Sequence, residues 1–89
     1  MRNNHLQCQT NCFQKYRKAR GLKQKDVAAI LGLKSTGMIS RWEKGVCLPD
    51  TLNLLRLSVI YRRLVDALVI DLIRRLRDEI FRKEKEVLG

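Results

Sequence analysis

The chain contains few cysteines, prolines and aromatic residues. Its 89 residues include three cysteines and one proline, and only 6% are aromatic. An odd number of cysteines without framework spacing excludes a disulfide-stabilised scaffold, so we expect reduced thiols and a cytoplasmic protein. No apolar run approaches the length of a membrane span, and residues 1–12 are too polar for a signal peptide. We therefore expect one domain whose core consists mainly of Leu, Ile and Val.

Patterns typical of catalysis are also missing. The sequence shows no nucleophile beside a base, no pair of catalytic carboxylates and no glycine-rich phosphate loop. We therefore expect no enzyme, no cofactor and no small-molecule substrate. A helix would bring His5, Cys8 and Cys12 to one side, but three ligands without a fourth predict no metal site. Cys47 falls in an expected loop and is expected to be a free thiol.

Positive charge is abundant and unevenly placed. Nineteen Lys and Arg against nine Asp and Glu give a formal net charge of +10. Residues 1–61 hold eleven basic and three acidic side chains, whereas residues 62–89 hold eight and six. The excess predicts a polyanionic partner for the first two-thirds of the chain. Charge alone does not decide this, because small proteins can be basic without binding a polyanion.

Helical patterns follow one another along the chain after residues 1–10, which we expect to be a flexible lead-in. The first helix starts at Asn11, with a capping box to Gln14, and ends before Gly21. The second spans 24–31, and its apolar face is predicted to be Val27, Ile30 and Leu31.

Three more helices are expected. One spans 36–43, one begins at Asp50 or Thr51 just after the only proline, and one spans 64–87. The apolar positions of the helix after Pro49 are Leu52, Leu55 and Val59, with Leu54 and Ile60 as further candidates. No stretch alternates apolar and polar residues for long enough to form a strand, so the predicted fold class is all-α.

Helices 24–31 and 36–43 are joined by the short segment "GLKS". A helix pair with a glycine in the turn is typical of a helix-turn-helix. In that motif the first helix crosses the DNA backbone and the second lies in the major groove. Ser35 or Thr36 is the expected N-cap of the second helix. The free N–H groups of its first turn would attract phosphate.

Residues 16–57, "YRKARGLKQKDVAAILGLKSTGMISRWEKGVCLPDTLNLLRL", resemble the Cro and phage-repressor (Xre-like) helix-turn-helix family. The match rests on residues in a fixed order: Arg17 four before Gly21, Gln24, Val27-Ala28, Gly32, Ile39 to Glu43, Gly45 and Pro49. The resemblance implies a five-helix lambda-repressor-like domain, here with a long C-terminal helix. It also implies a double-stranded DNA partner and a bacterial or phage-type, nucleoid-associated protein. The turn holds one residue more between Gly32 and Ile39 than the commonest family pattern.

The resemblance implies roles for single residues. The base-facing positions are Thr36, Gly37, Met38 and Arg41. The phosphate-contacting positions are Gln24, Lys34, Ser35, Ser40 and Lys44. The resemblance also implies that Gln24 caps its helix and that Arg17 pairs with Glu43. Ile39 and Trp42 are expected to be core residues.

Side-chain chemistry adds to this assignment. Arg41 is the strongest candidate for base reading, because arginine can donate two hydrogen bonds to guanine O6 and N7. Thr36 and Met38 could contact a thymine methyl. Gly37 costs about 1 kcal/mol of helix stability against alanine. Either a close approach of backbone to DNA or an irregular helix start would explain it.

The last predicted helix carries an apolar repeat with alternating steps of four and three residues, typical of a coiled coil. The seam consists of Val69, Ile73, Leu76, Ile80, Lys83 and Val87. A neighbouring stripe, Leu64, Leu68 and Leu72, is expected to pack on the core. We predict a DNA-binding domain at 11–61 and a dimerisation element at 62–89. The alternative is a helix that folds back to complete a monomer.

The sequence thus predicts a sequence-specific transcriptional regulator, a repressor that binds a palindromic operator as a homodimer. Protein concentration, or a regulatory protein on the C-terminal helix, would set its occupancy. The alternative is a helical adaptor without DNA-binding activity that acts through that helix. RNA is a third possible partner, although the sequence predicts no sheet with aromatic residues on which bases could stack.

Overall fold

The computed structural model describes residues 11–89, which form helices and no strand. The helices are α2 (Phe13–Ala19), α3 (Gln24–Leu31), α4 (Gly37–Lys44), α5 (Thr51–Tyr61), α6 (Val65–Leu68) and α7 (Ile70–Leu88). The prediction of an all-α fold is confirmed. The lead-in predicted for residues 1–10 lies outside the described residues.

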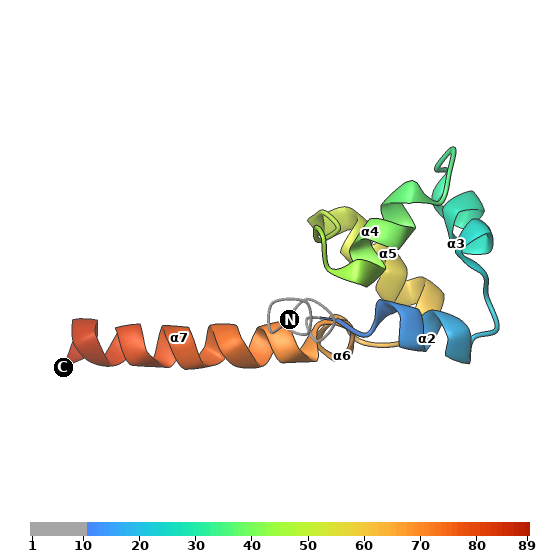
Figure 1. Cartoon of the computed structure of the whole chain (residues 1–89). Helices are drawn as coiled ribbons and strands as arrows, with labels where there is room; N and C mark the ends of the chain where they lie inside the picture. Colours follow the sequence, from blue (N-terminus) through green and yellow to red (C-terminus); the bar gives the residue numbers. More distant parts are fainter. Residues whose placement is uncertain (1–10) are drawn as a thin grey trace.

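Helices α2 to α6 pack around one core, and α7 leaves this domain as a straight rod (Figure 1). The principal dimensions are 49 × 30 × 22 Å, and the radius of gyration is 14.8 Å. A globular chain of this length has a radius of gyration of about 12 Å. The rod therefore accounts for the elongated shape.

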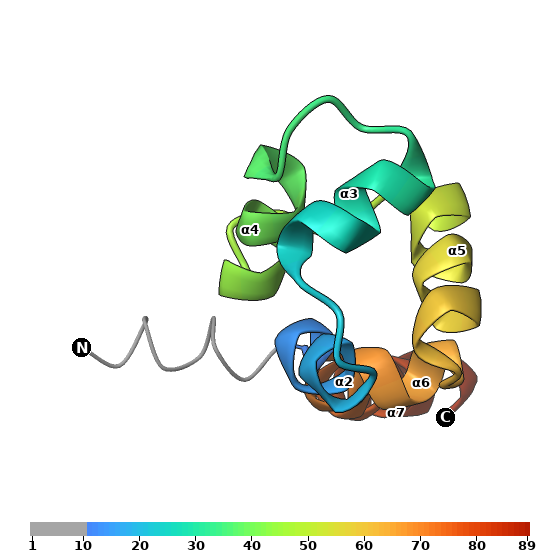
Figure 2. The ribbon, with the colours of Figure 1, turned by 90° about the vertical axis from the view of Figure 1, so that its right-hand side faces the viewer.

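The core collects apolar side chains from every helix of the domain and from the residue before α7. Its buried members are Phe13, Val27, Ala28, Ile39, Trp42, Leu57, Ile60, Tyr61, Leu68 and Val69. Helix α3 contacts both α4 and α5, while α2 contacts α4 (Figure 2). The core thus holds α4 between its neighbours and leaves one side of it open.

Two predicted apolar faces are wrong in part. Ile30 is exposed, because Val27 and Ala28 form the buried face of α3. On α5, Leu52, Leu55 and Val59 are exposed. The helix buries the further candidate Ile60, together with Leu57 and Tyr61. Helix α5 has apolar residues all around its circumference, so periodicity did not identify the face that meets the core.

The helix predicted over 64–87 is broken at Val69, where φ is −127° and ψ is 38°. The backbone N–H of Cys12 donates to the carbonyl of Leu68 at 2.6 Å. The break allows the adjacent side chains of Leu68 and Val69 both to enter the core. Leu72 packs against the same core, but Leu64 is exposed, so its predicted packing is wrong.

The predicted dimer seam also needs correction at its start. Val69 is buried in the domain core, and Ile73 packs against that core, so neither is free for a partner. From Leu76 onward every residue of α7 is exposed, including Ile80 and Val87. The uncovered seam therefore consists of Leu76, Ile80, Lys83 and Val87.

Candidate nucleic-acid interface

Helix α4 has one buried face and one open face. Ile39 and Trp42, three residues apart, are buried in the core. Gly37 and Arg41 are exposed, and Met38 is 37% exposed. Arg41 Nη1 lies 3.8 Å from Met38 Sδ, a weak acceptor that leaves the guanidinium available for another partner. The open face thus offers the guanidinium of Arg41 and a bare stretch of backbone at Gly37, with the thioether of Met38 at its edge.

The first turn of α4 follows directly after Ser35 and Thr36. Thr36 occupies the N-cap position without a side-chain capping bond, and Ser35 Oγ accepts a hydrogen bond from Gly37 N at 3.3 Å. Helix geometry leaves the N–H groups of Met38 and Ile39 without acceptors inside the helix. These donors favour an anion at this end of α4.

Gly37 is not required by the packing of the protein. A Cβ built at this position would meet only Ser35 Oγ, at the ordinary contact distance of 3.5 Å. Its φ is not positive, unlike that of Gly32, which ends α3 at φ 77°. The described residues therefore give no internal reason for glycine at the start of α4.

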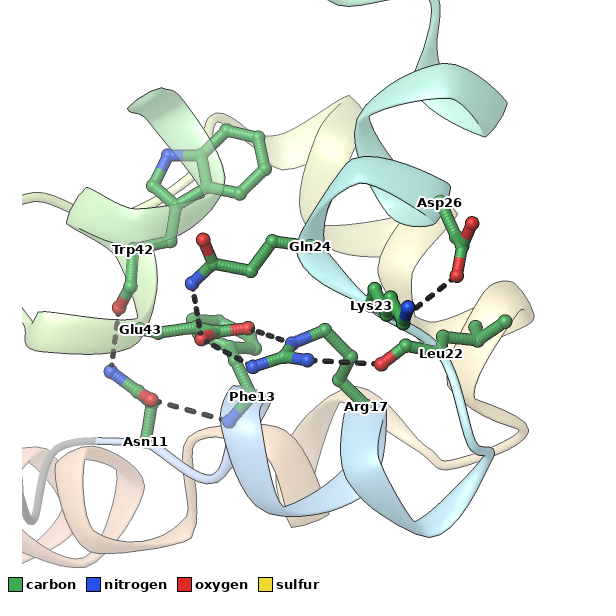
Figure 3. A network of polar contacts seen from close by, with 9 residues as sticks. All are labelled: Asn11, Phe13, Arg17, Leu22, Lys23, Gln24, Asp26, Trp42 and Glu43. Carbon is green, nitrogen blue, oxygen red and sulfur yellow. Dashed lines mark hydrogen bonds and ion pairs between the residues drawn. The ribbon is translucent and has the colours of Figure 1, made fainter. Parts of the chain in front are cut away.

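A buried ion pair holds the end of α4 to α2 (Figure 3). Arg17 Nε lies 2.6 Å from Glu43 Oε2, and Arg17 Nη2 donates to Glu43 Oε1 at 3.1 Å. The two side chains are only 8% and 4% exposed. Arg17 Nη1 also donates to the Leu22 carbonyl at 2.9 Å, so the two-pronged contact extends to the turn before α3.

The charges of this pair act on each other and on a neighbour. The hydrogen bond to Glu43 raises the pKa of Arg17, so the guanidinium stays charged. Burial raises the pKa of Tyr61, and the negative charge of Glu43 raises it further. The guanidinium of Arg17 is therefore charged beside a neutral phenol, and its contact with Glu43 orients α4 without occupying the open face of this helix.

Gln24 does not cap its helix, so that prediction is wrong. Lys23 holds the N-cap position of α3, and Asp26 Oδ2 accepts the hydrogen bond from Lys23 N at 2.8 Å. Gln24 Nε2 donates instead to Glu43 Oε1 at 2.9 Å. Gln24 thus connects α3 to α4 through the same carboxylate that binds Arg17 (Figure 3).

Asn11 was expected only to cap the first helix, and its larger contact was missed. Its Oδ1 accepts a hydrogen bond from Phe13 N at 3.2 Å, and its Nδ2 donates to the Trp42 carbonyl at 3.0 Å. Among the described residues Gln14 makes no hydrogen bond to Asn11, so the predicted capping box does not form. No local pattern reveals a partner 31 residues away.

The remaining candidate residues belong to the turn before α4 and to α4 itself. Lys34, Ser35 and Lys44 are exposed, and Thr36 and Ser40 are partly buried. None of these five side chains forms an ion pair within residues 11–89.

A helix-turn-helix family model matches residues 13–66, more than half of the chain. The chain belongs to the Cro/Xre-like helix-turn-helix family. The residues matched in this helix-turn-helix protein include α3 and α4, the two helices for which the sequence predicts the motif. Neither a curated protein nor a solved structure gave a match to the chain.

Membership of the helix-turn-helix family establishes a DNA-binding transcriptional regulator and confirms the resemblance drawn from residues 16–57. The family is one of DNA-binding regulatory domains and not of enzymes. None of the helices in residues 11–89 has the length and apolarity needed to span a bilayer.

The other chemical candidates give no site in the described residues. Cys12 and Cys47 are free and partly buried, while His5 and Cys8 lie outside the described residues. Residues 11–89 contain no group of three His, Cys, Asp or Glu side chains placed to hold a metal ion.

Proposed function

We propose that the protein is a repressor that reads a specific sequence of double-stranded DNA with α4 in the major groove. It binds a palindromic operator as a homodimer. A repressor of this kind acts by occupying its operator and excluding the transcription machinery. The family supplies the DNA-binding role, and the arguments below support the finer assignments.

The observation that carries the proposal is the open face of α4. Gly37 and Arg41 point away from the buried Ile39 and Trp42, and Met38, 37% exposed, lies at the edge between the two faces. Arg41 suits a guanine, and the thioether and methyl groups of Met38 and Thr36 suit a thymine methyl. Glycine at position 37 fits a close approach between helix backbone and DNA, since the domain itself does not need it.

Phosphate contacts are proposed for the residues that flank this face. The ammonium groups of Lys34 and Lys44 are exposed at the two ends of α4, and Ser35 and Ser40 supply hydroxyls. Gln24 has one amide proton left beyond its bond to Glu43. Contacts of this kind set the position of the protein on DNA without reading sequence.

The homodimer is proposed from the uncovered seam of α7, defined above as Leu76, Ile80, Lys83 and Val87. An amphipathic rod outside the domain leaves apolar surface in water until another helix covers it. Two copies related by a twofold axis match a palindromic site, and two linked domains bind more tightly than one.

Selection from a random duplex library tests this proposal. We expect one enriched motif with two inverted half-sites. Fluorescence anisotropy on that duplex and on a scrambled duplex should then show stronger binding to the first and a steep fall in affinity with salt. Equal binding to both duplexes would contradict sequence-specific reading. Affinity independent of salt would contradict DNA binding by this surface.

The second candidate function is an adaptor that acts through α7. The uncovered seam favours it, because the same apolar residues would accept a helix of a different protein. The DNA measurements separate the two functions, since an adaptor would show no enriched motif.

A further inference from the structure

The uncovered seam of α7 is symmetric about its own midpoint. Leu76 and Ile80 are 44% and 47% exposed, and Lys83 and Val87 are also exposed. In the heptad these residues occupy alternating d and a positions. The spacing from Leu76 to Ile80 equals that from Lys83 to Val87, so the seam can be matched to its own reverse.

We infer that α7 pairs with α7 of a second copy in an antiparallel orientation, with Arg77 of each copy facing Glu84 of the other. The inference rests on the homodimer of the proposed function and specifies how the two copies are arranged. The partner is a second copy, because the seam residues and the charged residues beside them match the same residues of another copy in reverse order.

The register follows from the residues that the domain leaves free. In an antiparallel pair, each a position packs beside a d position of the other helix. Leu76 then meets Val87 of the second copy, and Ile80 meets Lys83. All four uncovered seam residues of each copy thus have a partner in the other copy. The pairing does not require Val69, which stays buried in the domain core.

The charges beside the seam distinguish the two orientations. Arg77 and Glu84 each follow a d position, and antiparallel pairing brings them together twice per dimer. In a parallel pair, Arg77 would face Leu72 and the two copies of Lys83 would share one layer. Both orientations bring glutamates together, Glu79 with Glu86 if antiparallel and Glu79 with Glu84 if parallel.

The repulsion between glutamates occurs in both orientations, so it does not favour either of them. The difference lies in two attractive pairs gained and one contact between lysines avoided. Opposite charges beside a helix seam favour the arrangement that pairs them. The charge pattern of α7 therefore selects the antiparallel dimer.

The antiparallel arrangement places the two domains at opposite ends of the paired rods. At a rise of about 1.5 Å per residue, the two Ile70 residues lie about 34 Å apart. One turn of duplex DNA has about the same length. A parallel pair would instead bring both domains to the same end.

Sedimentation equilibrium on the full chain tests the orientation. Glu84→Arg places two arginines face to face in the antiparallel dimer, and we expect a rise of about tenfold in the dimer dissociation constant. Arg77→Glu should act in the same direction, and the double variant Arg77→Glu/Glu84→Arg should restore the original constant. Asp78→Arg is the matched control, because it makes the same change of charge on the face opposite the seam. Circular dichroism establishes that each variant keeps its helices.

The opposite result has a clear meaning. In a parallel dimer, Glu84→Arg removes the repulsion with Glu79 and tightens association, and this would overturn the inference. An unchanged constant would overturn it too. A protein that stays monomeric at every concentration would refute the proposed homodimer as well. A dimer that responds as expected but selects no DNA motif would uphold the inference and refute the proposed function.

Discussion

Arg41 and Glu43 lie two residues apart on α4 but have opposite surroundings. Arg41 is exposed on the open face, whereas the carboxylate of Glu43 is buried against Arg17 and Gln24. At the scale of single residues, the helix thus separates the groups that we propose to contact DNA from the groups that hold the helix in place. Each kind of residue can be changed without touching the other.

Replacing Arg41 with alanine should weaken binding to the selected operator by about 1–3 kcal/mol and relax the preference at one base pair. The reason is the loss of two hydrogen bonds to one guanine. Anisotropy titrations on the operator and on its single-base variants measure the effect. Arg56→Ala removes an exposed arginine from α5 and serves as the control. Equal weakening on every duplex would make Arg41 a phosphate contact.

Gly37→Ala should have opposite effects on the stability of the domain and on its affinity for the operator. Alanine favours the helix by about 1 kcal/mol, and its Cβ meets only Ser35 Oγ at 3.5 Å, so we expect a higher free energy of unfolding. The same methyl group would obstruct a close approach to DNA, and we expect weaker operator binding. Urea denaturation and anisotropy on the same variant measure the two effects. If binding were unchanged, the glycine would reflect only an irregular helix start.

At the scale of elements, one carboxylate connects three helices. Glu43 at the end of α4 accepts hydrogen bonds from Arg17 of α2 and from Gln24 of α3. Asn11 adds a second contact from the segment before α2 to the backbone of α4. The orientation of α4 is therefore set at its C-terminal end, away from the first turn that we propose to face DNA.

Glu43→Gln keeps the shape of this side chain but leaves the guanidinium of Arg17 without a counter-charge. A buried charge that loses its partner is costly, and we expect a loss of about 3 kcal/mol in the free energy of unfolding. Urea denaturation measures it. The double variant Arg17→Met/Glu43→Met should lose less, because it leaves no unpaired charge. A loss below about 1 kcal/mol for the single variant would show that water screens the pair as it does at a surface.

At the scale of the whole molecule, we propose separate functions for the compact domain and the uncovered rod. The domain holds the excess of positive charge and the open face of α4. The rod carries mixed charges around an apolar seam, as expected for a helix that associates with another helix. Changes in the rod should therefore alter association and leave the domain folded.

Lys83→Leu should tighten the dimer, because it replaces the one charged residue of the uncovered seam with an apolar side chain. Sedimentation at several concentrations measures the change. Lys85→Leu lies away from the seam on the same helix and provides the control. Unchanged sedimentation of Lys83→Leu would refute the assignment of the seam.

The positions of α3 and α4 and the core residues Ile39 and Trp42 could be predicted from the sequence. In α4, two apolar residues three apart stand among polar ones, so only one face can be buried. The excess of basic residues and the glycine in the turn also indicated a helix-turn-helix. These features depend on neighbours within a few positions, and local pattern therefore determined them.

Only the tertiary structure decided the features that depend on distant partners. Helix α5 is apolar on all sides, and the surrounding helices select Leu57 and Tyr61 for burial in place of Leu52 and Leu55. The break at Val69 accompanies a hydrogen bond from Cys12, far away in sequence, to the Leu68 carbonyl. The hydrogen bond from Gln24 to Glu43 likewise joins residues that are far apart in the sequence. Each of these side chains or backbone groups could be buried or hydrogen-bonded in more than one way. The local sequence does not distinguish these alternatives, so the packing of distant segments decides between them.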